Sequence, residues 1–133
     1  MRNSAYISNM KIAKCTIDDL PVFRDLSRQT FYDAYEKNTD PNDLQKYITE
    51  NFSTEAVSSE LSDPDSAIFL LKDNENILGF TKLRWNTYHE LLSGKAIELQ
   101  RIYVRKEFYG KGYGKTLLDH AENYSREQGF EWI

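Results

Sequence analysis

The sequence predicts one α/β (α+β) domain in which helices flank a sheet. Two apolar segments, 66–72 and 77–85, stand on either side of the turn residues 73–76, which is the pattern of a β-hairpin. Segments with helical apolar spacing precede and follow this hairpin. A chain of 133 residues is long enough for one domain and too short for two. We therefore expect a single domain over 10–133, preceded by an N-terminal extension at 1–9.

The first half of that domain is predicted to be mainly helical. A short strand spans 10–15, and a helix follows for which Thr16 or Asp18 supplies the N-terminal cap. The apolar stripe of this helix is formed by Leu20, Phe23, Leu26 and Phe31. Two more helices are predicted at about 42–51 and 54–61, and Asp-Pro pairs mark the start of one and the end of the other.

The second half places a strand and a helix after the hairpin. A polar loop at 86–95 leads to a strand at 96–104. The last helix ends near Gly129, and its apolar stripe is formed by Leu117, Leu118, Ala121 and Tyr124. Residues 130–133 have the pattern of a further strand. Because the chain stops where that strand begins, we expect the domain to be incomplete at its C terminus.

Composition indicates which kinds of partner and which cellular compartment to expect. The net charge of −4 argues against nucleic acid as a partner. No apolar segment approaches the roughly 20 residues that span a bilayer, and the first ten residues lack a signal-peptide pattern, so we expect a cytoplasmic protein without a membrane partner. No metal site is expected, because the single Cys15 and the isolated His89 and His120 form no spaced ligand set.

A glycine-rich loop follows the predicted strand at 97–104 and opens directly onto a helix. Backbone amides at such a helix start favour a phosphate. Gly114-Lys115-Thr116 fits the second half of a Walker A motif, but Tyr109 stands where the first glycine is required. The dinucleotide fingerprint also fails, since a pattern that starts at Gly110 ends on Lys115 instead of glycine.

A third glycine motif fits better and carries a family resemblance. The segment Tyr109-Gly110-Lys111-Gly112-Tyr113-Gly114 resembles the Gln/Arg-x-x-Gly-x-Gly/Ala loop of the GCN5-related N-acetyltransferases (GNAT family). Both obligatory glycines match, at Gly112 and Gly114, whereas Tyr109 replaces the Gln or Arg. The order of elements is similar over 10–133. The resemblance implies a mixed, mostly antiparallel sheet, here truncated after the start of the fifth strand.

Within that family the chain resembles the spermidine/spermine N-acetyltransferases of the PaiA type. The resemblance lies in residues 30–33, 44–48 and 98–104. It implies transfer of an acetyl group from acetyl-CoA, the cosubstrate, to a primary amine, with a polyamine such as spermidine as the leading candidate. The alternative is an acyl-CoA-binding module without catalysis. We expect a small-molecule amine as partner and allow for a homodimer.

The family resemblance also assigns the cofactor contacts. The backbone of Ile102, Tyr103 and Val104 would pair with the pantetheine arm. The pyrophosphate would be held by Gly110, Lys111, Gly112, Tyr113, Gly114 and Lys115. The two lysines add positive charge near the phosphates, although ordinary solvated lysines at a helix start are the alternative interpretation. No metal takes part.

Glu98 is the candidate catalytic residue. An amine must lose its proton before it attacks a thioester, and a carboxylate can remove that proton directly or through a water. Glu98 resembles the general-base glutamate of some family members in its spacing from the loop. Strict strand alternation would put Glu98, Gln100, Ile102 and Val104 on one face. A solvated carboxylate, or one that only binds a cationic substrate, remains the alternative. The family's tyrosine general acid would lie beyond Ile133.

Overall fold

The computed structural model describes residues 10–85, 95–131 and 133. It divides into two compact units, one formed by Met1–Lys14 with Pro64–Ile133 and the other by Cys15–Asp63. We call the first the sheet unit and the second the helical unit, and each is described by itself. The predicted extension at 1–9 and most of the predicted loop at 86–95 lie outside the described residues.

The helical unit contains three α-helices. A 3-10 turn, η1 (Ile17–Asp19), leads into α2 (Leu20–Tyr35), and η2 (Glu36–Asn38), α3 (Pro41–Asn51) and α4 (Thr54–Leu61) follow. Of these helices, α3 and α4 begin with a side-chain cap, from Asp40 and Ser53. Thr16 and Asp19 form a reciprocal capping box at the start of η1. The first helical turn is 3-10, and the α-helix begins at Leu20, later than predicted. The buried residues that join the helices are Phe23, Leu26, Leu44, Ile48 and Val57.

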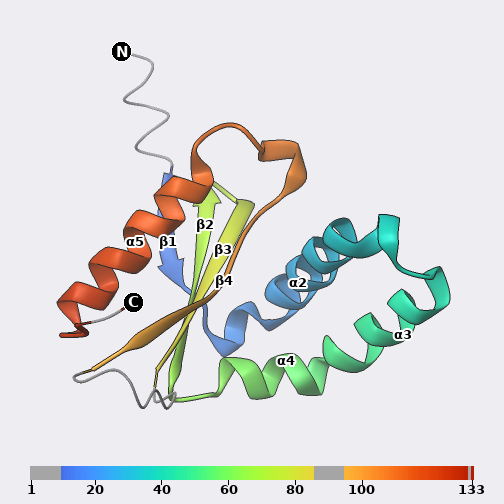
Figure 1. Cartoon of the computed structure of the whole chain (residues 1–133), viewed down its shortest axis with the longest axis horizontal. Helices are drawn as coiled ribbons and strands as arrows, with labels where there is room; N and C mark the ends of the chain where they lie inside the picture. Colours follow the sequence, from blue (N-terminus) through green and yellow to red (C-terminus); the bar gives the residue numbers. More distant parts are fainter. Residues whose placement is uncertain (1–9, 86–94, 132) are drawn as a thin grey trace. The chain divides into compact units, whose positions relative to one another are not determined.

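The sheet unit is a four-stranded antiparallel sheet in the order β1-β2-β3-β4 (Figure 1). Its strands are β1 (Met10–Lys14), β2 (Ser66–Asp73), β3 (Asn76–Trp85) and β4 (Ile97–Val104). After β4 the short η3 (Lys106–Phe108) leads to α5 (Tyr113–Glu127), which packs against β3 and β4. These elements confirm the predicted α/β fold.

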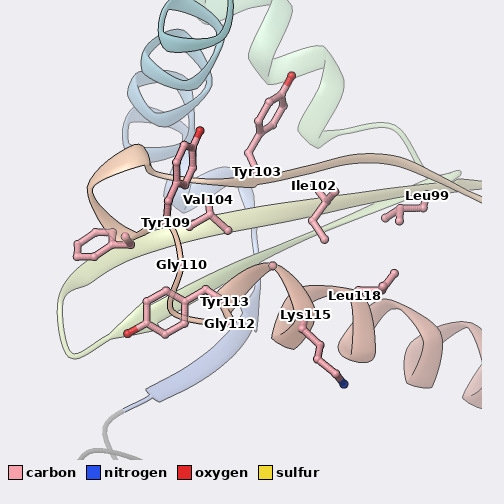
Figure 2. A pocket seen from close by; sticks show the side chains of 12 residues that line it. Leu99, Ile102, Tyr103, Val104, Tyr109, Gly110, Gly112, Tyr113, Lys115 and Leu118 are labelled. Carbon is pink, nitrogen blue, oxygen red and sulfur yellow. The ribbon is translucent and has the colours of Figure 1, made fainter.

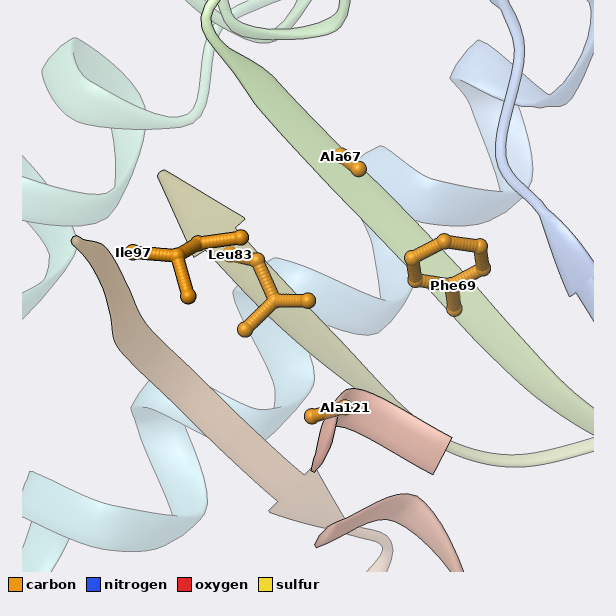
Figure 3. Close-up of a cluster of buried hydrophobic side chains, with 5 residues drawn as sticks. All are labelled: Ala67, Phe69, Leu83, Ile97 and Ala121. Carbon is orange, nitrogen blue, oxygen red and sulfur yellow. The ribbon is translucent and has the colours of Figure 1, made fainter. Parts of the chain in front are cut away.

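The core of the sheet unit lies between α5 and the strands. Ala121 of α5 meets side chains from three strands (Figure 3), namely Ala67, Phe69, Leu83 and Ile97. Nearer the start of α5, Leu117 packs with Leu71 and Leu78. Because side chains alternate across a strand, the residues between these positions belong to the opposite face of the sheet.

The C-terminal segment was predicted to start another strand. In the structure Phe130, Glu131 and Ile133 are not assigned to a strand, and Trp132 lies outside the described residues. The Glu131 N–H nevertheless donates to the Lys95 carbonyl oxygen at 2.8 Å, which places this segment beside the start of β4. Phe130 also packs against Trp85, with ring centroids 5.9 Å apart.

His120 is a polar residue within this apolar interface. Its ring meets Phe69 edge-on with centroids 4.5 Å apart, and its buried Nε2 has no hydrogen-bond partner among the described residues. Burial lowers the pKa of His120 below the ordinary value of 6.5, against a smaller opposing effect from Glu127. The folded chain therefore favours the neutral imidazole.

This pKa shift predicts an acid-sensitive contribution to stability. Below pH 6.5 the unfolded chain takes up a proton at His120 more readily than the folded chain, so stability should fall as the pH drops further. The variant His120→Leu should flatten that part of the curve, and thermal unfolding at a series of pH values measures it. An identical pH slope in the variant would contradict this account.

Candidate functional site

The candidate site begins at the close pairing of β3 with the second half of β4. A Cβ at Gly79 would collide with the Tyr103 carbonyl oxygen, so only glycine allows the strands to approach this closely. The Arg105 N–H donates to the Leu78 carbonyl at 2.9 Å. Tyr103 and Arg105 therefore direct backbone groups toward β3.

The intervening residues of β4 direct their backbone groups the other way. In an antiparallel strand the N–H and C=O of one residue point to the same side, and the side alternates along the chain. Ile102 and Val104 consequently present their amides and carbonyls at the edge of β4 that no described strand covers. This edge is where sequence analysis places the backbone contacts of Ile102, Tyr103 and Val104. The alternation leaves the backbone groups of Ile102 and Val104 available for that pairing, whereas those of Tyr103 point toward β3.

The first half of β4 is offset from the second by one extra residue. Leu83 pairs with Leu99 and Lys82 pairs with Arg101, which leaves Gln100 without a Cα partner. Such a bulge shifts the alternation of side chains by one position. The bulge therefore divides β4 into two segments whose side chains follow opposite phases.

The predicted common face of Glu98, Gln100, Ile102 and Val104 is wrong for this reason. Val104 packs against the cluster that Leu117 of α5 forms with Leu71 and Leu78. Ile102, two residues earlier, lies on the same side of the strand. Ile97 and Leu99 also pack on the α5 side, so Glu98 between them points to the opposite face, across from Arg84. The exposed Glu98 carboxylate is thus separated from the side chains of Ile102 and Val104.

The glycine loop has the backbone conformation that its sequence suggests. Gly110 and Gly112 have φ values of +81° and +83°, in the left-handed region that favours glycine. Gly112 is the N-cap of α5, and it has no side chain to satisfy the amides of the first turn. The Thr116 N–H returns to the Gly112 carbonyl, so the amides of Tyr113, Gly114 and Lys115 mark the positive end of the helix.

The edge of β4 and the glycine loop line one cavity of about 510 Å³ (Figure 2). Three elements contribute its walls: β4, the turn after it and the first two turns of α5. Figure 2 shows Tyr103 pointing away from α5 and Ile102 pointing toward it. The lining residues are Leu99, Ile102, Tyr103, Val104, Phe108, Tyr109, Gly110, Gly112, Tyr113, Gly114, Lys115 and Leu118.

The structure thus brings most of the predicted contact residues together. All of them line the cavity except Lys111, which is exposed beside it, and Glu98 also lies outside the lining. Four residues of the cavity wall were not among the predicted contacts, namely Leu99, Phe108, Tyr109 and Leu118. Leu118 was assigned to the apolar stripe of the helix, but its side chain is 37% exposed and forms part of the cavity wall.

Lys115 is already engaged by a neighbour on its own helix. Its Nζ lies 2.9 Å from Asp119 Oδ2, and this carboxylate raises the pKa of Lys115. Figure 2 shows the side chain running along α5 and away from the loop. In this arrangement the helix amides, and not the lysine, provide the positive end of the cavity.

Among the residues that the structure describes, no group of three His, Cys, Asp or Glu side chains is placed to hold a metal ion. No helix within the same ranges is long and apolar enough to cross a membrane.

Comparison with known proteins identifies the family. The family model described as "Acetyltransferase (GNAT) family" matches residues 21–133. An uncharacterized N-acetyltransferase from the pepI 3′ region of Lactobacillus delbrueckii subsp. lactis is 32% identical over 127 residues, which cover 95% of this chain and 71% of that protein. A spermidine N(1)-acetyltransferase of Thermoplasma acidophilum is 26% identical over 125 residues, covering 91% of this chain and 73% of that protein.

Solved structures agree with the sequence relatives. The PaiA N-acetyltransferase of Thermoplasma acidophilum in complex with coenzyme A superposes with a TM-score of 0.74 at 25% identity, covering 91% of this chain and 74% of that one. An aminoglycoside acetyltransferase from an uncultured soil sample, in complex with sisomicin, gives a TM-score of 0.71 at 20% identity and covers 95% and 76% of the two chains. The predicted family is confirmed, and the chain belongs to the GNAT family of acetyltransferases.

Proposed function

We propose that this chain transfers the acetyl group of acetyl-CoA to a primary amine and that a polyamine is its acceptor. The observation that carries the proposal is the cavity in which the edge of β4 that no described strand covers meets the N-terminus of α5. An edge of free amides and carbonyls suits an extended arm that carries amide groups of its own. A helix N-terminus without a side-chain cap suits a pyrophosphate. Coenzyme A combines both features.

The residues present fit that cosubstrate. The loop glycines Gly110, Gly112 and Gly114 leave open space where a Cβ would stand, which allows a phosphate to approach the backbone. Ile102 and Val104 would hold the pantetheine arm through their backbone groups, and the amides of residues 113–115 would hold the pyrophosphate. When bound, the thioester supplies an acyl group activated toward attack by an amine.

We assign Glu98 as the general base for that attack. Its carboxylate is exposed, so it can accept the proton of an ammonium directly or through one water. It points to the face of the sheet opposite α5, so the amine would approach β4 from that face. The uncovered edge of β4 would then receive the thioester between the amine and the phosphate loop.

A cationic acceptor is supported by the distribution of charge and by the relatives. The helical unit holds eleven Asp or Glu and four Lys or Arg residues, a net charge of −7, whereas the sheet unit carries a net charge of +3. Negative potential favours a polycation, and the positive unit favours the anionic coenzyme A. One relative is named a spermidine N(1)-acetyltransferase.

A panel of amines tests the proposal directly. Acetyl-CoA should be consumed in the presence of spermidine or spermine, and mass spectrometry should find the acetylated amine. Primary monoamines of similar length, which carry one positive charge instead of several, should react more slowly, because negative potential attracts a single charge less strongly. Binding of acetyl-CoA without acetylation of any amine would instead support the acyl-CoA-binding module, and no binding would overturn both.

A side chain at position 114 is expected to lower the affinity for acetyl-CoA without lowering the free energy of unfolding. Gly114 has an ordinary helical backbone with open space where a Cβ would stand, so Gly114→Leu should leave the free energy of unfolding unchanged or raise it by up to about 1 kcal/mol. The added side chain, larger than the alanine that the family loop also accepts here, should block the approach of the diphosphate and lower the affinity for acetyl-CoA roughly tenfold or more, the loss of one or two charge-assisted hydrogen bonds. Thermal unfolding and calorimetric titration measure the two effects.

Gly129→Ala is the matched control for backbone strain. Gly129 has a φ of +82°, close to that of Gly112, but lies outside the cavity lining. Alanine at either position should cost about 1 kcal/mol of stability, whereas only Gly112→Ala should also weaken binding. If Gly114→Leu and Gly112→Ala both bind acetyl-CoA normally, the loop has been misassigned.

The assignment of Glu98 predicts a selective loss of turnover. Glu98→Gln should reduce kcat at neutral pH by about 100-fold or more, as expected for removal of a general base, while the dissociation constant for CoA stays unchanged. Activity that recovers as the pH rises would agree with this role, because the free amine is then more abundant. The control is Glu75→Gln, at an exposed carboxylate in the β2–β3 turn. Unchanged kcat in Glu98→Gln would exclude Glu98 as the base.

A further inference from the structure

Thr81 is a buried polar residue of β3 whose hydroxyl binds the neighbouring strand. Its side chain is fully buried, and its Oγ1 donates to the carbonyl oxygen of Arg101 at 3.1 Å. A buried hydroxyl normally finds a partner. Here the partner is a backbone atom of β4 and not a group of the strand that carries Thr81.

That hydrogen bond lies at the point where β4 changes register. Arg101 directly follows Gln100, the residue without a Cα partner on β3. A bulge weakens the ladder locally, since one residue makes no regular pair. The Thr81 hydroxyl supplies an additional bond between the strands at this weak point.

The same bond fixes the orientation of one peptide group. With the Arg101 carbonyl directed toward β3, the Ile102 N–H points to the opposite side, because the peptide is planar and trans. The opposite side is the uncovered edge of β4. Ile102 lines the cavity together with Val104.

We propose that Thr81 is a positioning residue for the acyl-CoA arm. Its hydroxyl holds the Arg101–Ile102 peptide so that the Ile102 amide is presented to the ligand, although Thr81 itself contacts no part of it. This inference rests on the proposed function, because it takes the edge of β4 as the place where the pantetheine arm lies. The Gly112 loop holds the opposite end of the ligand and does not depend on Thr81.

The test compares two ligands that use different parts of the cavity. Acetyl-CoA would contact both β4 and the glycine loop, whereas 3′-phospho-ADP carries the diphosphate and lacks the pantetheine arm. Thr81→Val removes the hydroxyl and keeps the branched shape, and Thr81→Ser restores the hydroxyl. Ile68→Val is the matched control, since it removes one methylene from a buried residue of β2 without breaking a hydrogen bond. Calorimetric titration gives the affinities and thermal unfolding gives the stabilities.

We expect Thr81→Val to weaken acetyl-CoA binding roughly three- to tenfold, which corresponds to one hydrogen bond, and to leave 3′-phospho-ADP binding unchanged. Thr81→Ser should bind both ligands like the wild type, and so should Ile68→Val. An equal loss for both ligands in Thr81→Val, or wild-type affinity for acetyl-CoA, would overturn the positioning role. Failure of the proposed function looks different, because the unmodified chain would then bind neither ligand.

Discussion

The pairing of β3 with β4 is the constraint on which the rest of the site depends. Gly79 lets the backbone of β3 approach the Tyr103 carbonyl, and the extra residue Gln100 offsets the first half of β4 from the second. Together these features settle which backbone groups of β4 bind β3 and which remain at the uncovered edge. They also settle which side chains meet α5. A side chain at position 79 would force the strands apart and would disturb all of these relationships together.

The electrostatics of the cavity depend on backbone more than on side chains. Tyr109 stands where the family loop has Gln or Arg, and Lys115 is paired with Asp119. The N-terminus of α5 offers the partial positive charge of its first amides, and the glycines keep that surface open. The loop can therefore serve as an anion site without a dedicated cationic side chain. This explains how the substitution at Tyr109 is compatible with the architecture.

The sequence predicts the elements well because each has a clear period or a strong boundary residue. Gly129 and Pro41 mark helix ends, and the hairpin follows from its apolar segments and turn. The common face assigned to Glu98 and Ile102 failed because strict alternation was assumed. A signal of the bulge is nevertheless present, since apolar residues at 97 and 99 resume at 102 and 104, one position out of phase. The contacts of Gly79 and Thr81 are made with the backbone of β4, so they cannot be predicted from the sequence of β3 alone.

The length of β4 also has an electrostatic consequence, because the strand carries the proposed base near one end and lines the cofactor cavity near the other. Glu98 and Val104 are six positions apart, which corresponds to about 20 Å along an extended strand. That separation is about twice the Debye length at ordinary ionic strength, so a carboxylate at one end is screened from a diphosphate at the other. The bulge also places the Glu98 side chain on the face of the sheet opposite to that of Ile102 and Val104. The proposed base therefore remains available to a cationic amine on one side of the sheet, while the helix amides remain available to an anion at the other end.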